Sequence, residues 1–548
     1  MLAKRLIYLI ALVMGTGWSW GQAPEAEPSE AVPVTMLLRD YQFVRQQEAW
    51  LVCDNAAGLT RYNSQNIAEA NMSLSCGRGG LTNYYESPKL LQLDAAIESF
   101  YRISDRTMVF GRMSYNNYTG RDMTGSAFMH LNQRLYPFDI VEDSLTNQGR
   151  KHRDTYQLTG AVGVDVWRGL SLGMRVDYTA ANYAKYKDLR HKNKLMDLTA
   201  TAGIMAPVSN VASIGADYRY HRNVESVTFG TYGKSDKVYK SLIDYGNSIG
   251  KVEQFGSYGY TDKSREMPLF DEGHGVGVQL EVKPVNGLSF HNEFVCSHRS
   301  GYYGRKSPYT ITYTNHHGNS YVYNGRLTFR NHRSFHQLGI SLEAEKLQNN
   351  AKTYRELQND AGSNYYEYYD DVKTADKLKV NTTVGYTAHL GIRHELPTWT
   401  LCASLAMLHR KQTAYFYPYL RRQDINNKTI SLQATHNLCL RHGVLSVSAS
   451  LGYQTGSGNP YEDDTFINPS DKQSSPDEMS AFLWREYQYL TAARYEVDAC
   501  IKYAFLFPGT RLKTHVGLTV NHRKANETYD YSNGKDYTQM AVSLGCTF

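Results

Sequence analysis

Charged side chains at every second position are the residues of this sequence best placed to do chemistry. In the stretch "YLTAARYEVDACIKYAFLF", Arg494, Glu496, Asp498 and Lys502 alternate with mostly apolar residues. Alternation with a period of two puts the two kinds of side chain on opposite faces of a β-strand. A sheet of such strands therefore has one apolar face and one face that carries charge.

The same parity along the chain collects acidic and basic residues in comparable numbers on the polar face. They are Asp94, Glu98, Arg102, Asp165, Arg175, Asp177, Asp217, Arg219, Glu281, Glu293, Arg326, Glu343, Glu345, Lys379, Arg393, Arg494, Glu496, Asp498, Lys502 and Lys513. Such a face can line a polar conduit or binding cavity, where mixed charges set a field across the path of a solute. It can equally form a lattice of ion pairs that stiffens the wall or holds an N-terminal plug.

The period-two pattern dominates the chain from about residue 66 onward and predicts about 18 strands. We expect them at 66–76, 90–103, 107–118, 155–167, 170–183, 194–206, 210–222, 273–283, 287–299, 320–330, 334–346, 377–394, 399–413, 427–441, 443–454, 487–505, 509–523 and 537–548. Short turns such as "WRG" and "RHG" alternate with long loops rich in Tyr and Asn. These loops lie near 119–154, 223–272, 300–319, 347–376 and 455–486.

Short turns that alternate with long loops are typical of an outer-membrane β-barrel, in which the short turns face the periplasm. The apolar face of each strand then meets lipid, and the charged face lines the lumen. This arrangement accounts for a mean hydropathy of -0.51, because only alternate residues meet lipid. A soluble β-sandwich or propeller is the alternative, but neither requires loop lengths to alternate. We expect an all-β transmembrane antiparallel barrel in the outer membrane of a Gram-negative cell.

Residues 1–21, "MLAKRLIYLIALVMGTGWSWG", have the composition of a secretory signal peptide. Basic residues precede an apolar run, and small residues occupy the positions that a signal peptidase reads. We expect residues 22–65 to form a short, partly helical segment, either periplasmic or a lumenal plug. The barrel then occupies residues 66–548.

The N-terminal segment contains the motif "CDNAAGLTRYN". Its residues 55–59 resemble the Asn-Pro-Ala-Gly-Leu element in the N-terminal hatch of the long-chain fatty-acid outer-membrane transporter family, with Ala56 in place of proline. Over its full length, the chain resembles an uncharacterised outer-membrane barrel family of Bacteroidota in its signal peptide, "CDNAAGL" motif, Tyr-rich loops and terminal phenylalanine. Members of that group tend to lie beside TonB-dependent uptake systems, so this resemblance implies an accessory transport role.

Motifs for catalysis and for metal binding are missing from the sequence. It has no P-loop and no HExxH motif, and its cysteines are scattered without CxxC spacing. His291, His389 and His515 fall singly on the polar face, where a lone histidine is more often a hydrogen-bonding residue than a ligand for iron or haem. We therefore expect no catalytic residue, no metal and no cofactor. A hydrolase site at the barrel rim is the alternative.

The last stretch, "MAVSLGCTF", predicts a closing strand with Met540 and Val542 toward lipid. Its terminal Phe548 resembles the signal that the barrel assembly machinery reads. The Tyr-rich acidic stretch "SNYYEYYDD" in a predicted loop can bind a glycan, calcium or a surface lipoprotein, or can simply be a polar surface.

Solute or nutrient transport, accessory to a TonB-linked system, is the function that we expect from these features. The alternative is a plugged barrel that serves as a scaffold for a surface lipoprotein or complex. The expected partners are outer-membrane lipid and the barrel assembly machinery, with a surface lipoprotein or a TonB-dependent receptor as further candidates. A net charge of +6 without a basic run gives no reason to expect a nucleic acid.

Overall fold

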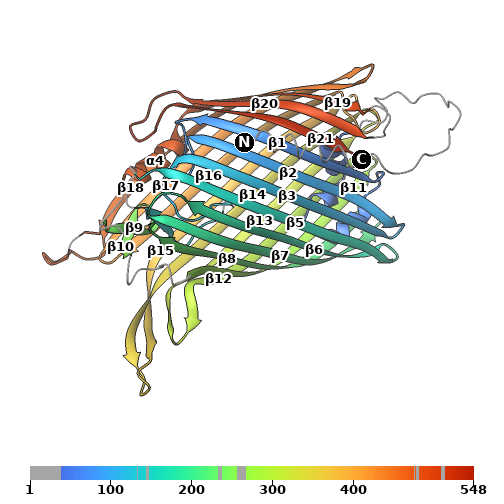
Figure 1. Cartoon of the computed structure of the whole chain (residues 1–548). Helices are drawn as coiled ribbons and strands as arrows, with labels where there is room; N and C mark the ends of the chain where they lie inside the picture. Colours follow the sequence, from blue (N-terminus) through green and yellow to red (C-terminus); the bar gives the residue numbers. More distant parts are fainter. Residues whose placement is uncertain are drawn as a thin grey trace.

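The computed structural model describes residues 39–131, 134–142, 147–232, 237–255, 267–473, 475–476, 480–507 and 512–548. Within them, 18 antiparallel strands form one barrel (Figure 1). These strands are β1 (Ile67–Gly79), β2 (Lys89–Ser104), β3 (Thr107–Met123), β5 (Gly149–Trp167), β6 (Leu170–Lys185), β7 (Arg190–Ser209), β8 (Ala212–Gly230), β11 (Met267–Val285), β12 (Leu288–Ser307), β13 (Thr310–Arg330), β14 (Ser334–Gln358), β15 (Asn364–Leu390), β16 (Trp399–Phe416), β17 (Tyr419–Leu440), β18 (Gly443–Thr465), β19 (Arg494–Leu506), β20 (Lys513–Ala525) and β21 (Asp536–Thr547). The predicted signal peptide, residues 1–21, lies outside the described residues.

The first and last strands close the barrel. β1 pairs with β2 on one side and with β21 on the other, and Phe548 N donates to Ala68 O at 2.8 Å. Each range predicted from the period-two pattern overlaps one of the 18 strands, in the same order. The predicted antiparallel barrel is therefore confirmed.

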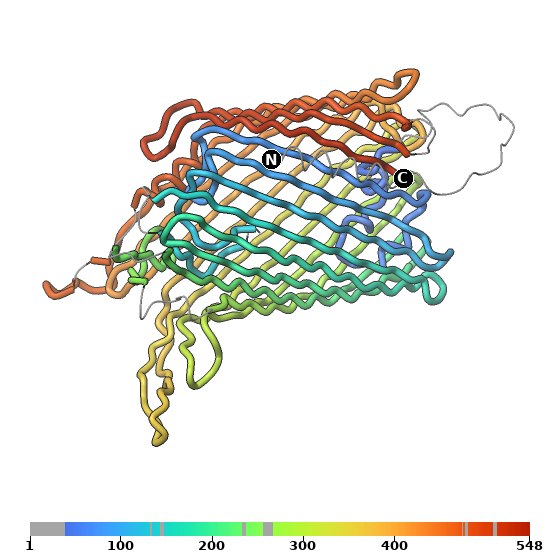
Figure 2. The backbone as a smooth tube through the Cα atoms, in the orientation of Figure 1, coloured from blue at the N-terminus to red at the C-terminus, as the bar shows by residue number. Residues whose placement is uncertain are grey.

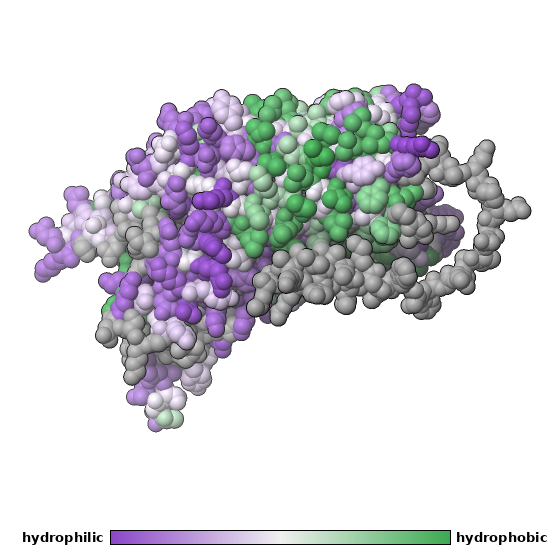
Figure 3. All heavy atoms as spheres, turned by 45° about the horizontal axis from the view of Figure 1, so that its top comes forward, coloured by the Kyte–Doolittle hydropathy of each residue, from purple (hydrophilic) through white to green (hydrophobic). Residues whose placement is uncertain are grey.

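Side chains on the outer face of the barrel are apolar over a belt. On β6, Leu172, Met174 and Val176 are exposed, whereas Arg175 and Asp177 between them form ion pairs inside the lumen. Figure 3 shows such hydrophobic residues gathered over the middle of the barrel, with a mostly hydrophilic surface at the end that carries the long hairpins. This belt is the surface that a bilayer covers in an outer-membrane barrel.

Two of the predicted loops are extended hairpins instead. β12 and β13 continue through residues 300–319, and β14 and β15 continue through most of residues 347–376. Both hairpins project well beyond the barrel (Figure 2). Their Tyr and Thr residues favour extended backbone, so hydrogen-bonded pairing persists after the lipid-facing pattern has ended. The acidic Tyr-rich stretch consequently lies in β15 rather than in a loop.

A small second sheet lies at the extracellular mouth, within segments predicted as loops. Its strands pair in the order β10-β9-β4 and are β4 (Asp139–Glu142), β9 (Tyr239–Gly246) and β10 (Ile249–Phe255). Phe138 and Ile243 of this region are fully buried against Leu269 and Tyr303 of the barrel wall. These short strands lack an alternating pattern, because they are buried by packing inside the mouth.

The helix α4 (Ser480–Thr491) lies beside this sheet and corrects one predicted strand boundary. The predicted strand 487–505 begins only at Arg494, and the preceding residues are helical. Phe482 of α4 packs against Val141 and Leu242. Tyr487, Tyr489 and Thr491 fall at alternate positions, as strand residues do, but this packing against the small sheet stabilises a helix instead. We call residues 124–142, 239–255 and 480–491 the outer cap.

The opposite, periplasmic end of the lumen holds the described part of the N-terminal segment. It forms α3 (Tyr41–Gln46) and the 3-10 helices η1 (Ala49–Leu51) and η2 (Ala56–Arg61). We call residues 40–62 the plug. None of the helices described in the structure has both the length and the apolar character needed to cross a membrane.

Candidate functional site

The plug is built from short helices with satisfied ends. The carboxylate of Asp40 caps α3 by accepting from Gln42 N at 2.9 Å and Phe43 N at 3.1 Å. Asn55 caps η2 in the same way, because its Oδ1 accepts from Ala57 N at 3.1 Å. Phe43 and Ala57 are almost completely buried, so the plug has a small core that it shares with the barrel wall.

Wall glycines allow the plug backbone to approach the strands closely. A Cβ on Gly173 of β6 would clash with Ala57 N, and a Cβ on Gly203 of β7 would clash with the side chain of Asn55. Only glycine leaves room for such an approach. The small residues of the "NAAGL" motif therefore pack against a part of the wall where Gly173 and Gly203 have no side chains.

The amide of Asn55 fixes the motif against several strands. Its Nδ2 donates to Ile204 O of β7 at 3.0 Å and to Gln279 Oε1 of β11 at 2.9 Å. Gln279 in turn donates to Asp217 at 2.5 Å. The single charged or polar side chain that the motif presents to the wall is thus fully used in holding it there.

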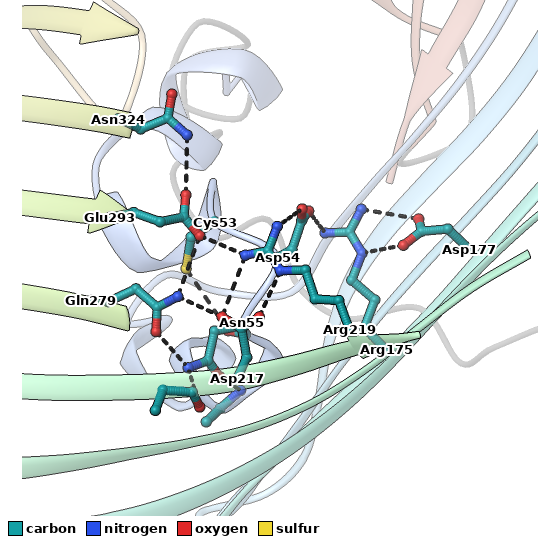
Figure 4. Close-up of polar contacts among 12 residues, drawn as sticks. Cys53, Asp54, Asn55, Arg175, Asp177, Asp217, Arg219, Gln279, Glu293 and Asn324 are labelled. Atoms are coloured by element: carbon teal, nitrogen blue, oxygen red, sulfur yellow. Dashed lines mark hydrogen bonds and ion pairs between the residues drawn. The ribbon is translucent and has the colours of Figure 1, made fainter. Parts of the chain in front are cut away.

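Asp54 lies between two wall arginines (Figure 4). It pairs with Arg175 at 3.1 Å and with Arg219 at 2.9 Å. Arg219 also pairs with Asp217 at 2.6 Å and with Glu293 at 2.8 Å. One guanidinium with five donors in a planar fork can serve several carboxylates at once. Arg219 is therefore the centre of a network that joins the plug to β8 and β12.

Trp50 adds an aromatic anchor beside this network. Its Nε1 donates to Glu281 Oε2 at 2.9 Å, and its ring meets His291 edge-on with centroids 5.0 Å apart. Only 1% of Trp50 is exposed. Glu281 is also 3.2 Å from Lys283, so its charge stays compensated.

Two ionisable side chains of the plug, Cys53 and Tyr41, are held neutral. Burial raises the pKa of the Cys53 thiol, and the nearby carboxylate of Glu293 raises it further. Burial likewise raises the pKa of the Tyr41 hydroxyl, with a further contribution from Glu98. Cys53 therefore stays a thiol at neutral pH, a form that is a poor nucleophile and a poor metal ligand.

The predicted charged residues divide into two sets. We call the lumen face of β5–β8, β11 and β12 the plug-facing arc, and the lumen face of β16–β21 the open arc. On the plug-facing arc six of the predicted residues form ion pairs in or beside the network just described: Arg175, Asp177, Asp217, Arg219, Glu281 and Glu293. On β2, Glu98 lies 3.8 Å from Arg45 of the plug, and Arg102 donates to Tyr62 O.

The open arc has no hydrogen bond or ion pair to residues 40–62 within the described part of the chain. Glu496, Asp498 and Lys502 have no ion-pair partner within 4 Å there, and Asn521 donates to Glu496 at 2.9 Å and to Asp498 at 2.5 Å. Hydroxyl side chains fill much of the rest, with Ser404 and Ser431 2.7 Å apart. Gln433 faces the lumen and is exposed, so water reaches this wall.

The remaining predicted residues are spread over both arcs and the strands between them. Asp94 accepts from Gln92 and Asn116 of the neighbouring strand, and Arg494 donates to Tyr489 O of α4. By strand register, Asp165, Arg326, Glu343, Lys379 and Lys513 also face the lumen. Arg393 does not, because β15 ends at Leu390 and Arg393 is exposed in the turn that follows.

A second charged network holds the outer cap, and Glu345 is its one member that was predicted from the sequence. Arg134 of the cap pairs with Asp271 of β11 at 3.1 Å, and Asp271 is also 2.6 Å from His316. Arg299 joins Asp271 to Glu345, with 2.8 Å to the latter. Asp271 and His316 lie where loops were predicted, so strand parity could reveal them only if the strands were extended outward. Arg299 is the last residue of the predicted strand 287–299.

Lysines from the wall hold the cap at another point. Lys151 of β5 lies 3.1 Å from Glu142, and Lys185 of β6 contacts the same carboxylate. Both lysine side chains are buried. Nearby, burial opposes ionisation of Asp139, but hydrogen bonds from His130 and Ser126 outweigh this effect and lower its pKa. The cap is thus joined to the wall by charges as well as by its apolar core.

Metal chemistry has no structural support in the part of the chain that the structure describes. No group of three or more His, Cys, Asp or Glu side chains there is arranged to hold a metal ion. His291, His389 and His515 lie on different parts of the lumen wall, and all seven cysteines are free.

The fold and the lumen define an outer-membrane β-barrel that encloses a segment from its own N-terminal region. The chain belongs to a family of unknown function, DUF6850, whose model matches residues 56–548. No curated protein matches the sequence.

Solved structures of outer-membrane barrels are similar in fold only. The ferric preacinetobactin receptor BauA from Acinetobacter baumannii is 9% identical, with 88% of this chain and 80% of the receptor covered and a TM-score of 0.39. The outer-membrane transporter YddB from Escherichia coli is 8% identical, with 89% and 81% covered and a TM-score of 0.40. A FadL homologue from Pseudomonas aeruginosa is 10% identical, with 90% and 92% covered and a TM-score of 0.31.

Proposed function

We propose that the protein passes a hydrophilic solute across the outer membrane along the open arc. The observation that carries this proposal is the set of partly accessible charges Glu496, Asp498 and Lys502, which lack ion-pair partners in the described chain, on a wall to which the plug makes no hydrogen bond or ion pair there. Charges without ion-pair partners avoid a large desolvation cost only if they remain hydrated. Such a wall keeps a water-filled space beside the plug.

The plug and the outer cap serve as two gates in this proposal. The plug narrows the periplasmic end through polar contacts such as those of Asp54 and Asn55 with the wall. The cap covers the extracellular mouth through an apolar core that includes Phe138 and Ile243. A solute enters when the cap moves, and it leaves past the plug. No catalytic step is part of this function.

The proposal extends to an accessory role in a TonB-linked uptake system. Its support is the sequence resemblance to barrels that lie beside such systems, together with the hatch-like residues 55–59. A polar plug that is held by side-chain contacts can be displaced without unfolding the barrel, because its residues form no strand of the barrel sheet.

Recordings in planar bilayers test the transport proposal. We expect the full barrel to show small, infrequent openings, and a variant without residues 22–62 to conduct several-fold more current. The matched control shortens the β14–β15 hairpin by replacing residues 353–370 with an Asn-Gly turn. This hairpin lies outside the lumen, so the conductance of the control variant should equal that of the full barrel. A plug deletion that folds and never conducts would refute the proposal.

The second candidate function is a scaffold for a surface lipoprotein, and the projecting hairpins favour it. On the β14–β15 hairpin, Tyr354, Tyr366 and Tyr368 form a cluster with ring centroids 5.6 and 6.1 Å apart. Tyrosine supplies large contact areas at protein interfaces. A scaffold should co-purify with a stoichiometric partner in mild detergent, and the shortened hairpin should lose that partner. A transporter should purify alone in both forms.

A further inference from the structure

A cavity of about 400 Å³ lies between the plug and the lumen face of β12–β15. Cys53 lies on the plug side of this wall cavity, and His291, Glu293, Arg326 and Gln337 lie on the barrel side. Gly339 of β14 and Gly385 of β15 face each other in register. A Cβ on either glycine would meet nothing closer than 3.9 Å, so the wall is hollowed at this point.

Three of the residues that line the wall cavity carry polar atoms without partners. Arg326 Nη1, Gln337 Oε1 and His291 Nε2 are shielded from solvent and have no hydrogen-bond partner among the described residues. Only 5% of His291 is exposed. Leaving a buried polar group unsatisfied costs stability, so such groups are rare in native proteins. Three of them around one cavity indicate a place where a polar ligand completes the hydrogen bonding.

The charges around the wall cavity do not balance. Glu293 is compensated by Arg219 at 2.8 Å and accepts from Asn324 at 3.1 Å, contacts that are drawn in Figure 4. Among the described residues that line the cavity, Arg326 is the charged side chain left without an ion-pair partner within 4 Å. An unpaired guanidinium in a partly enclosed site favours an anion, above all a carboxylate or phosphate that matches its fork.

We propose that the wall cavity binds a small hydroxycarboxylate. The carboxylate pairs with Arg326, one hydroxyl donates to Gln337 Oε1, and a second hydroxyl bonds to His291 Nε2. An inorganic anion without an O–H group, such as sulfate, would satisfy Arg326 but would leave the acceptor Gln337 Oε1 without a donor. That this ligand is also the transported solute rests on the proposed function, whereas the binding itself does not.

Calorimetry on the full-length protein in detergent tests the site with gluconate as the probe. Sorbitol is the matched ligand, because it has a similar hydroxylated carbon chain without the carboxylate. We expect gluconate to bind at least tenfold more tightly than sorbitol. Arg326→Gln should weaken gluconate binding at least tenfold and leave sorbitol unaffected. Arg441→Gln, the same substitution in an exposed periplasmic turn, should bind gluconate as the native protein does.

A second variant keeps the test decisive if Arg326→Gln fails to fold. Gly339→Leu places a side chain in the hollow, so it should abolish gluconate binding and leave Arg326 in place. Undetectable gluconate binding by the native protein, or equal affinity in the native protein and either cavity variant, would overturn the site. If the protein binds gluconate but never conducts, even without the plug, the transport proposal is wrong and the binding site is supported. If the protein conducts but does not bind gluconate, the binding site is wrong and the transport proposal is supported.

Discussion

The plug-facing arc and the open arc share the same alternation of apolar and charged residues, but their charged side chains differ in whether they form ion pairs. On the plug-facing arc, Arg175 and Arg219 each contact acidic groups of both the wall and the plug. On the open arc, Glu496, Asp498 and Lys502 lack such partners among the described residues. Strand parity determines which face a charge occupies, but a second segment of the chain determines whether it is paired.

This difference assigns a separate task to each side of the lumen. Ion pairs that are shielded from water by the plug are strong and directional, so the plug-facing arc holds the segment in place. Hydrated charges on the open arc interact weakly with one another and remain available to solutes. The two interpretations that the sequence left open, a conduit and an ion-pair lattice, thus describe two different sides of one barrel.

Substitution of Arg219 gives the largest expected effect. Arg219→Gln leaves the carboxylates of Asp54, Asp217 and Glu293 without their shared cation, and removing one partner of a buried ion pair typically costs about 3–5 kcal/mol. We expect the amides of residues 41–61 to lose protection against hydrogen exchange by that amount. Lys502→Gln on the open arc is the control and should change protection by less than about 0.5 kcal/mol. Equal effects of the two variants would abolish the distinction between the arcs.

The barrel was predictable from the sequence because every strand has lipid on one face and water on the other, so apolar and polar residues alternate along all of them. The order of the strands, the closing strand and the direction of Met540 and Val542 all follow from that pattern. The outer cap was not predictable, because β4, β9 and α4 are stabilised by contacts with each other inside the mouth rather than by a repeating environment.

The site was predictable only in part, for a related reason. Parity found Arg175, Arg219 and Glu293, but Asp54 and Arg134 belong to segments without a period-two pattern. The "NAAGL" motif pointed to the plug, yet its match to Gly173 and Gly203 depends on strands more than a hundred residues away in the sequence. A contact between segments so far apart in the sequence has no signature in the residues on either side of it.

The glycine patch gives the next largest effect. Gly173→Ala places a methyl group against the plug backbone at Ala57, and such overpacking typically costs about 1–3 kcal/mol. We expect the plug to shift and Cys53 to react with a maleimide, detected on its own peptide by mass spectrometry. Gly452→Ala on the open arc is the matched control, since the nearest atom to its Cβ would be Glu496 Cβ, at an ordinary contact distance of 3.4 Å. Labelling of Cys53 in the control but not in Gly173→Ala would contradict the proposed contact.

The outer cap should respond to pH in the direction set by Asp244. Burial raises the pKa of Asp244 from 3.8 to about 6, with Lys377 partly opposing the shift. The closed cap therefore binds a proton more tightly than the open form, and its stability falls as the pH rises from about 4 to about 6. Asp244→Asn keeps an acceptor for Gly246 N, 2.8 Å away, and removes the charge. We expect it to stabilise the cap by about 1–2 kcal/mol at pH 7 and not at pH 4.

Hydrogen exchange of residues 239–246 at the two pH values measures this effect on the cap. The plug offers an internal comparison, because it lies at the other end of the lumen, and its protection should not differ between Asp244→Asn and the native protein. A stabilisation of equal size at both pH values would show that the charge of Asp244 is not its cause.

The smallest effect on stability is expected on the open arc, where function should change instead. Asp498 accepts hydrogen bonds from Ser450 at 2.9 Å and Asn521 at 2.5 Å, but it has no ion-pair partner within 4 Å in the described chain. Asp498→Asn should therefore change stability by less than about 0.5 kcal/mol. In the complete barrel, it should lower the preference for cations over anions about twofold, because charged side chains that line a pore set its selectivity. Asp177→Asn on the plug-facing arc is the matched substitution and should leave selectivity unchanged in the complete barrel, since Arg175 and the plug occupy that side. A larger shift in selectivity from Asp177→Asn would place the solute path on the wrong arc.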